Sequence, residues 1–169
     1  MQNDIIIRKA STADIPNISQ VLAESWRVAY QGIVDAAYLS QISDDRWVES
    51  LEGNLPSGQT EVLVACCGPQ IIGAVLMQPS RMPQYPEDGE ITAIYLHPNW
   101  LGKGVGQSLM DKALSHLREK GFAYVVLDVL RDNQKAKRFY LKNGFAFTGH
   151  TVELTLGTPA VCEVMRKRV

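Results

Sequence analysis

The segment Leu101-Gly102-Lys103-Gly104-Val105-Gly106-Gln107 decides the fold class, because the side-chain periodicity changes across it. Residues 90–96 before it form a β-rich run, which His97-Pro98 interrupts, and residues 104–120 after it place apolar side chains on one helical face. Glycines at a helix N-terminus leave backbone N–H groups open to an anion, which the helix dipole also favours. The segment therefore predicts a phosphate-binding turn in an α/β domain, with a plain strand-to-helix turn as the alternative.

The rest of the chain alternates strand and helix patterns in the same way. Strand patterns cover residues 5–9, 61–66, 71–77, 124–130, 145–153 and 161–167. Helical patterns follow Ser11 as far as Gly32 and cover residues 36–42, 44–55 and 135–142. The run 124–130 is almost continuously apolar, which is typical of a strand buried on both faces. Without a repeat or a break in composition, residues 1–169 are expected to form a single α/β domain with a mixed sheet.

The composition excludes several classes of partner. Lys and Arg number 17 and Asp and Glu 18, so the net charge of −1 provides no general attraction for nucleic acid or anionic lipid. No run approaches the roughly 18 apolar residues of a membrane span, and the first residues lack the features of a signal peptide. The three cysteines form no C-x-x-C pair, and the three histidines lack ligand spacing. We therefore expect a cytoplasmic protein without a metal site.

Two familiar phosphate-binding motifs do not match the glycine segment. A P-loop requires Ser or Thr after its Gly-Lys pair, whereas Lys103 is followed by Gly104. A dinucleotide fingerprint G-x-G-x-x-G ends on Leu109 if it starts at Gly104, and on Gln107 if it starts at Gly102. A nucleotide-binding function is therefore disfavoured.

Residues 90–145 resemble the GNAT superfamily of N-acetyltransferases. Residues 90–98, the glycines and the following helix are similar to that family's acetyl-CoA-binding motif. A second element, N-x-x-A-x-x-F-Y-x-x-x-G-F, is matched by Asn133, Ala136, Phe139, Tyr140, Gly144 and Phe145. One position departs from the family pattern, since Leu101 stands where Gln or Arg usually begins the glycine loop. We expect this difference to weaken the electrostatic grip on phosphate without abolishing binding, because backbone amides make most of the contacts.

The resemblance implies a single-domain GNAT-like fold with a mixed, mostly antiparallel sheet flanked by helices. Two splayed strands would form the acetyl-CoA cleft, in which the backbone of Ile94, Tyr95 and Leu96 pairs with the pantetheine arm. The pyrophosphate would lie on the amides of Leu101, Gly102, Lys103, Gly104, Val105, Gly106 and Gln107. Asn133 would contact the pantetheine arm, and Tyr140 would face the thioester sulfur. For the Lys103 side chain, a solvated position is the alternative to a phosphate contact.

Acetyl transfer to an amine requires two proton movements. An alkylammonium, with a pKa of about 10.4, must lose a proton, and a thiolate, with a pKa of about 8.5, leaves more easily when protonated. The resemblance makes Tyr140 the acid and Glu90 the base, and it suggests the Leu96 N–H as a donor to the thioester oxygen. The alternatives are that Tyr140 only packs with its neighbours and that Glu90 is an exposed edge residue. His97 is a competing base.

The resemblance implies an enzyme, an acyltransferase that moves acetyl from acetyl-CoA to an amine by direct attack. Trp26, Arg27, Tyr30 and Gln31 resemble the start of a W-R-x-A-Y-x-G-I segment found in bacterial members, although Trp26 and Tyr30 are also spaced as core residues. We expect a small primary amine as the acceptor. A protein or peptide acetyltransferase and a non-catalytic acyl-CoA sensor are the alternatives. A homodimer is also expected from the family.

Overall fold

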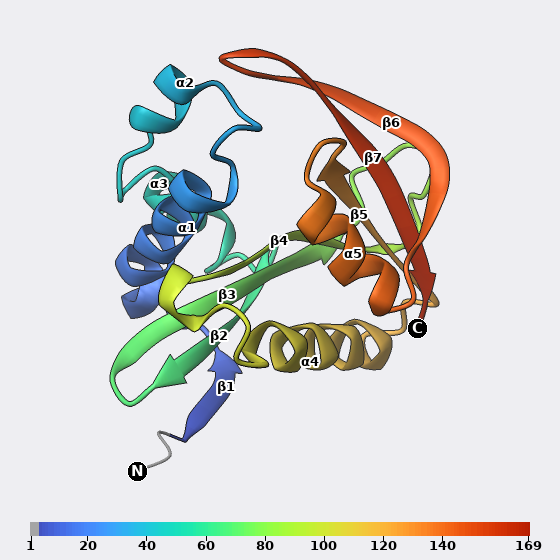
Figure 1. The fold of residues 1–169 in the computed structure, drawn as a ribbon. Helices are drawn as coiled ribbons and strands as arrows, with labels where there is room; N and C mark the ends of the chain where they lie inside the picture. Colours follow the sequence, from blue (N-terminus) through green and yellow to red (C-terminus); the bar gives the residue numbers. More distant parts are fainter. Residues whose placement is uncertain (1–3) are drawn as a thin grey trace.

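Seven strands form one sheet in the computed structural model, which describes residues 4–169 (Figure 1). The strands are β1 (Ile5–Lys9), β2 (Glu61–Cys67), β3 (Gln70–Pro79), β4 (Gly89–Leu96), β5 (Tyr124–Leu130), β6 (Ala146–Leu156) and β7 (Thr158–Arg168). The helices are α1 (Ile15–Ala29), α2 (Ala36–Ser40), α3 (Val48–Asn54), α4 (Val105–Glu119) and α5 (Gln134–Lys142). The sheet order is β1-β2-β3-β4-β5-β7-β6, and of its neighbouring pairs β4 and β5 alone run parallel. The predicted mixed, mostly antiparallel sheet is confirmed.

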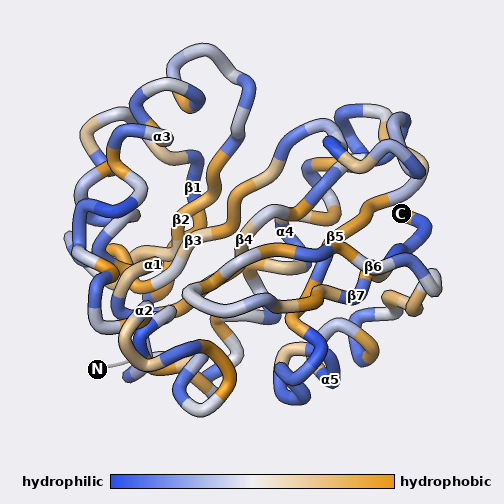
Figure 2. Tube along the Cα trace, turned by 90° about the horizontal axis from the view of Figure 1, so that it is seen from above, coloured by the Kyte–Doolittle hydropathy of each residue, from blue (hydrophilic) through white to orange (hydrophobic). Residues whose placement is uncertain are grey.

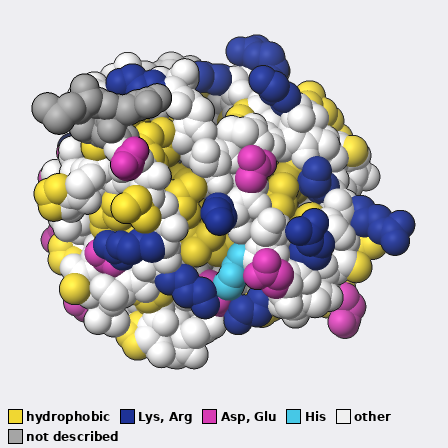
Figure 3. All heavy atoms as spheres, turned by 90° about the horizontal axis from the view of Figure 1, so that it is seen from below, with side chains coloured by type: hydrophobic (Ala, Val, Ile, Leu, Met, Phe, Trp, Pro, Cys, Tyr) yellow, Lys and Arg dark blue, Asp and Glu magenta, His cyan; other side chains and the backbone are white. Residues whose placement is uncertain are grey.

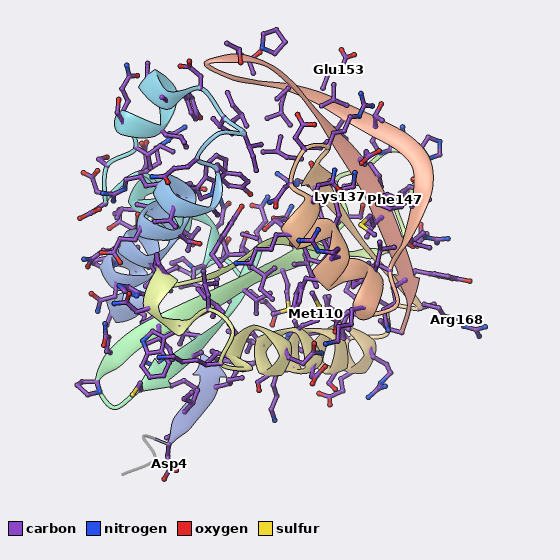
Figure 4. The ribbon with its side chains drawn as sticks, in the orientation of Figure 1. Asp4, Met110, Lys137, Phe147, Glu153 and Arg168 are labelled. Atoms are coloured by element: carbon purple, nitrogen blue, oxygen red, sulfur yellow. The ribbon has the colours of Figure 1, made fainter. Side chains whose placement is uncertain are left out.

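Alternating side chains of the sheet face two separate cores. In β2, Leu63 and Ala65 belong to the core under α4, whereas Val62 and Val64 belong to the core under α1. Successive residues of a strand point to opposite faces, so α1 and α4 cover opposite sides of the sheet. Met110 is fully buried and points from α4 toward the strands (Figure 4). The hydrophobic central strands lie between these layers, with hydrophilic segments outside (Figure 2).

The predicted helix start at Ser11 is confirmed, and a short 3-10 turn (Thr12–Asp14) precedes α1. The Asp14 carboxylate accepts hydrogen bonds from the Ser11 N–H at 2.7 Å and from Arg8 Nη1 and Nη2 at 2.7 and 2.9 Å. These bonds, led by the one from the Arg8 guanidinium, hold the pKa of Asp14 well below its usual range. The pair therefore ties β1 to the start of α1.

The feature of the fold that positions the site is the separation of β4 from β5. The two strands pair at Gly89 with Val125 and at Glu90 with Val126, and no further pair joins them among residues 4–169. The register between β3 and β4 shifts at the same place, because Leu76 faces Ala93 while Met77 faces Ile91. This extra residue in β4 is a β-bulge, which bends a strand and increases its twist. Beyond Glu90 the edge of β4 is consequently left without a strand partner.

The C-terminal hairpin is longer than the sequence predicts. β6 and β7 have 11 residues each and turn at Gly157, whose φ of +77° suits glycine. Most of β6 is exposed at the edge of the sheet, so the apolar pattern of its sequence is weak and does not mark where the strand ends. Seen from below, acidic and basic side chains are mixed around hydrophobic ones (Figure 3). Within residues 4–169, every helix is too short or too polar to cross a membrane.

Candidate active site

A cleft of about 770 Å³ lies where β4 and β5 diverge, and α1, α4 and α5 contribute to its walls. Most of the residues predicted for acetyl-CoA binding line it, namely Ile94, Tyr95, Leu96, Leu101, Gly102, Gly104, Gly106, Gln107, Asn133 and Tyr140. Two others do not. Val105, the first residue of α4, is buried, and Lys103 places its ammonium 5.0 Å from the centre of the Trp100 ring. The structure thus gathers residues from both predicted motifs around one cleft.

The backbone of β4 presents hydrogen-bonding groups to this cleft. The His97 N–H donates to the Ile72 carbonyl of β3 at 2.8 Å. Successive N–H groups of an extended chain point to opposite sides, so the Leu96 N–H points away from β3 and toward the gap. Such an edge can pair with an extended, amide-bearing ligand.

The N-terminus of α4 lies at the mouth of the cleft. Gly104 precedes the helix with a φ of +81°, and Gly102 has a φ of +73°, conformations that L residues rarely adopt. The Ser108 N–H donates to the Gly104 carbonyl at 3.1 Å, so the amides of residues 105–107 come before the first helical hydrogen bond. A helix N-terminus of this kind attracts a phosphate group.

Two lysines that the sequence did not single out also line the cleft. Lys135 and Lys142 lie in the first and last turns of α5, and both side chains are exposed. Leu101, which replaces the Gln or Arg expected at the start of the glycine loop, is 42% exposed. The two ammonium groups supply positive charge that Leu101 lacks. Their positions were hidden in the sequence, because α5 carries several basic residues and only the fold separates those that face the cleft.

Tyr140 lies on α5, whose start is capped by the Asn133 side chain accepting from the Ala136 N–H at 3.2 Å. Its ring packs against Phe139 and Phe145, with centroid distances of 5.6 and 6.0 Å. Burial, and to a lesser degree the nearby Tyr30 and Asp128, raise the pKa of Tyr140. The phenol therefore keeps its proton at neutral pH, as a general acid must. Packing and exposure to the cleft coexist at this residue.

The two predicted bases lie away from the cleft wall. Glu90 is 2% exposed, and its carboxylate accepts from the Arg81 N–H and Nη2, both at 2.9 Å. His97 places Nε2 at 3.2 Å from Glu24 Oε2, and its Nδ1 accepts from the Asn99 N–H at 3.2 Å. Neither side chain is among those that line the cleft.

Asp128 lines the cleft and was missed in the sequence. Its signal was present, since it is the one charged residue in the apolar run 124–130. Burial and the negative charge of Glu90 raise the pKa of Asp128. Trp26 of α1 and Tyr30, which directly follows α1, line the same cleft. Their spacing, which also fits core residues, therefore belongs to residues of the site. The Tyr30 hydroxyl lies 2.7 Å from the Tyr95 hydroxyl, and burial raises the pKa of Tyr30 to about 12.

Metal chemistry finds no support in the described part of the chain. Residues 4–169 contain no group of three or more His, Cys, Asp or Glu side chains placed to hold an ion. The polar groups that line the cleft include lysines, phenols and one carboxylate, which are suited to an anionic ligand and to proton transfer.

Comparison with known proteins identifies relatives along most of the chain. A spermidine N(1)-acetyltransferase of Thermoplasma acidophilum is 29% identical over 142 residues, which are 83% of this chain and 88% of that protein. An uncharacterized N-acetyltransferase of Bacillus subtilis is 28% identical over 134 residues, which are 76% of this chain and 73% of that protein. The model of the Acetyltransferase (GNAT) family matches residues 20–145 of this chain.

Solved structures give the same result. The PaiA N-acetyltransferase from Thermoplasma acidophilum, in complex with coenzyme A, has a TM-score of 0.76 at 25% identity and covers 98% of this chain and 99% of its own. A ribosomal-protein-alanine N-acetyltransferase from Brucella melitensis shares the fold, with a TM-score of 0.75 at 20% identity over 97% of this chain and 99% of its own. The resemblance deduced from residues 90–145 is confirmed. The chain belongs to the acetyltransferase (GNAT) family and is an N-acetyltransferase.

Proposed function

We propose that the cleft binds acetyl-CoA and transfers its acetyl group to a small primary amine by direct attack. The observation that carries this proposal is the unpaired edge of β4 beyond Glu90, which leads to the open amides at the start of α4. An extended amide-bearing arm that ends in a diphosphate matches these two features in order. Acetyl-CoA has this shape and supplies the thioester.

The residues of the cleft fit such a ligand. The amides of residues 102–107 would hold the diphosphate, and Lys135 and Lys142 would add positive charge. Glycine at positions 102 and 104 leaves open space where a Cβ would otherwise project. The backbone of Ile94, Tyr95 and Leu96 would pair with the amide-like arm, and Asn133 would contact the same arm from α5.

Tyr140 is proposed as the general acid. Its phenol is protonated at neutral pH, and it lines the cleft that would hold the thioester. The Leu96 N–H, pointing into the gap, would stabilise negative charge on the carbonyl oxygen. Glu90 remains a proposed base. Glu90 does not line the cleft, and its carboxylate accepts hydrogen bonds from Arg81. Glu90 would therefore have to act through a bridging water or through its charge.

A small amine fits the acceptor end of the cleft, where aromatic and aliphatic side chains of α1 and β6 form the wall, namely Trp26, Tyr30, Leu154 and Leu156. The named relative that acts on spermidine supports a small amine. The neighbour named for ribosomal-protein alanine shares only the fold at 20% identity, so it gives the protein alternative less support.

Thiol release from acetyl-CoA tests the proposal. The purified chain is incubated with n-butylamine, putrescine, spermidine or a peptide with an N-terminal alanine, and free CoA is measured over time. We expect acetyl-CoA to raise the midpoint of thermal unfolding and the small amines to accelerate thiol release. Acceleration by the peptide alone would support the protein alternative. Binding of acetyl-CoA without acceleration by any amine would support the sensor.

A further inference from the structure

One carboxylate of the cleft differs from all others that are shielded from solvent. Among residues 4–169, seven Asp or Glu residues are buried or half-buried: Asp14, Glu24, Glu61, Asp88, Glu90, Asp128 and Glu163. Six of them pair with a basic side chain: Asp14 with Arg8, Glu24 with His97, Glu61 with His116 and Lys120, Asp88 with Arg166, Glu90 with Arg81, and Glu163 with Lys137. Within the same residues, Asp128 has no Lys, Arg or His nitrogen within 4.0 Å. Shielded carboxylates are usually paired with a basic side chain, whereas the group hydrogen-bonded to Asp128 is the neutral Cys162 thiol, so the absence of a cation calls for an explanation.

The position of Asp128 points to a ligand as that partner. It lies two residues beyond Val126, the last residue of β5 that pairs with β4, and therefore in the open part of the wedge. Val126 and Leu130 point to the same face of β5 as Asp128, and both belong to apolar clusters other than the core under α4. The Asp128 side chain thus shares the face of the sheet on which α1 packs, and it lines the cleft there.

Aromatic rings surround the acceptor end of the same cleft. Trp26 and Tyr30 have centroids 4.5 Å apart, and Tyr95 lies 6.3 and 6.4 Å from them. The faces of such rings attract a cation, most strongly where water is excluded. A carboxylate beside three aromatic rings has the chemistry that suits an alkylammonium group.

We propose that Asp128 binds the ammonium nitrogen of the acceptor and takes its proton during acetyl transfer. This inference rests on the proposed function, assigns the role of base to Asp128 in place of Glu90, and names a substrate class, an alkylammonium on an aliphatic chain. Asp128 takes one proton from the ammonium, and the neutral amine then attacks the acetyl carbon. As the carbon–nitrogen bond forms and the carbon–sulfur bond breaks, nitrogen loses its second proton to water. Tyr140 donates a proton to the departing sulfur. Solvent then returns a proton to Tyr140 and removes one from Asp128, which balances the cycle.

The groups around Asp128 suit this role. Glu90 lies near Asp128 on β4, and Arg81 donates a hydrogen bond to the Glu90 carboxylate. The phenols near Asp128 are those of Tyr30 at the end of α1, Tyr95 of β4 and Tyr140 of α5. Burial and the charge of Glu90 raise the pKa of Asp128, which makes it a better proton acceptor than an ordinary aspartate. Glu90 is then a positioning residue that acts through its charge.

Cys162 does not compete with Asp128 as a reactive group. The thiol lies beside Asp128, and burial, together with the aspartate charge, raises its pKa to about 12. A thiol that stays protonated at neutral pH is a poor nucleophile. This supports direct attack by the amine without an acetyl-cysteine intermediate.

Binding and kinetics of Asp128→Asn test the proposal, with Glu61→Gln, a change at another half-buried carboxylate, as the matched control. Tryptophan fluorescence, to which Trp26 contributes, is titrated with n-butylammonium chloride, and the acetyl-CoA affinity is measured by calorimetry. We expect Asp128→Asn to weaken n-butylammonium binding at least about 10-fold and to lower kcat/KM for n-butylamine about 100-fold or more. The acetyl-CoA affinity should not change. Glu61→Gln should bind n-butylammonium within about threefold of the wild type, since Glu61 pairs with His116 and Lys120 outside the cleft.

The pH dependence of kcat/KM shows which of the two carboxylates, Asp128 or Glu90, accepts the proton. The acidic limb of kcat/KM should disappear in Asp128→Asn, and it should move to lower pH in Glu90→Gln, because the charge that raises the pKa of Asp128 is gone. Asp128→Glu should keep the limb. If Glu90→Gln loses the limb while Asp128→Asn keeps it, Glu90 is the base and the proposal is overturned. Should Asp128→Asn fail to fold, Asp128→Ser makes the same comparison.

The two proposals fail in different ways. Absence of acetyl-CoA binding in the wild type would refute the proposed function, whereas the n-butylammonium titration would still test Asp128. Saturable n-butylammonium binding that is equal in the wild type and Asp128→Asn, or no saturable binding in the wild type, would overturn the role of Asp128.

Discussion

Glu90 and Val126 are the last residues that pair β4 with β5, and the cleft begins directly beyond them. On one side of this junction the Glu90 carboxylate is closed off by Arg81. On the other side, Asp128 lies in the open wedge. The junction therefore separates two carboxylates: Glu90, which is paired with Arg81, and Asp128, which lines the cleft.

Replacing Tyr140 by Phe should remove the proton donor and leave the packing against Phe139 and Phe145 intact. We expect kcat to fall about 100-fold, since general acid catalysis contributes roughly 10²–10⁴-fold. The acetyl-CoA dissociation constant, measured by calorimetry, should stay within about twofold. Tyr85→Phe, which removes a hydroxyl bonded to His150, is the control and should leave kcat unchanged. An unchanged kcat in Tyr140→Phe would exclude the acid role.

Gly104→Ala tests the amide cradle, with Gly121→Ala as the matched control. Both glycines have positive φ, +81° and +96°, and open space where a Cβ would project. Each alanine should cost about 1–2 kcal/mol of the free energy of unfolding, because L residues disfavour this conformation. We expect only Gly104→Ala to weaken acetyl-CoA binding, by about 10-fold. Equal affinities in the two variants would show that the turn does not contact the ligand.

Gly73→Ala should destabilise the sheet beside the cleft. A Cβ at Gly73 would clash with Leu96 Cδ2 and lie 3.2 Å from the Tyr95 carbonyl oxygen, so the Leu96 side chain would have to move and the β4 backbone would have to shift slightly. We expect a loss of about 1–3 kcal/mol in urea denaturation, as for other overpacked sites. Gly53→Ala in α3 meets nothing within 4 Å and should raise stability by about 0.5–1 kcal/mol. No loss in Gly73→Ala would contradict the packing described.

The Arg8–Asp14 pair predicts a dependence of stability on pH. The pKa of the Asp14 carboxyl lies below its unfolded value of about 3.9, so its contribution is present above pH ~3.9 and is lost as the pH falls further. Asp14→Asn should lower the free energy of unfolding by about 1–3 kcal/mol at pH 7. The difference from the wild type should shrink between pH 4 and pH 2, roughly the range of that titration. Glu52→Gln, an exposed carboxylate, serves as the control. A difference that persists unchanged at low pH would contradict the assignment.

The order of strands and helices could be predicted because local patterns carry it. Strand 124–130 and the helix after Gly104 have clear periodicities, and glycine punctuates their ends. The end of β6 was missed, since an exposed edge strand has little apolar alternation to mark it. The glycine turn and Tyr140 were found through two motifs that the chain carries in sequence order.

The role of Asp128 could not be predicted from local sequence. It depends on where β4 stops pairing with β5, and hence on the bulge near Thr92, which lies 36 positions away. It also depends on the absence of a cation beside Asp128, which is a property of several elements packed together. Lys135 and Lys142 were missed for the same reason, because only the placement of α5 brings them to the mouth of the cleft.

The measurement that tests the account most directly is a crystal structure of the protein with acetyl-CoA. We predict that diphosphate oxygens lie within hydrogen-bonding distance of amide nitrogens of residues 102–107, with the pantetheine arm along Ile94 to Leu96 and the sulfur next to the Tyr140 hydroxyl. A ligand bound away from the wedge between β4 and β5, or a diphosphate held by side chains with those amides facing solvent, would contradict the account.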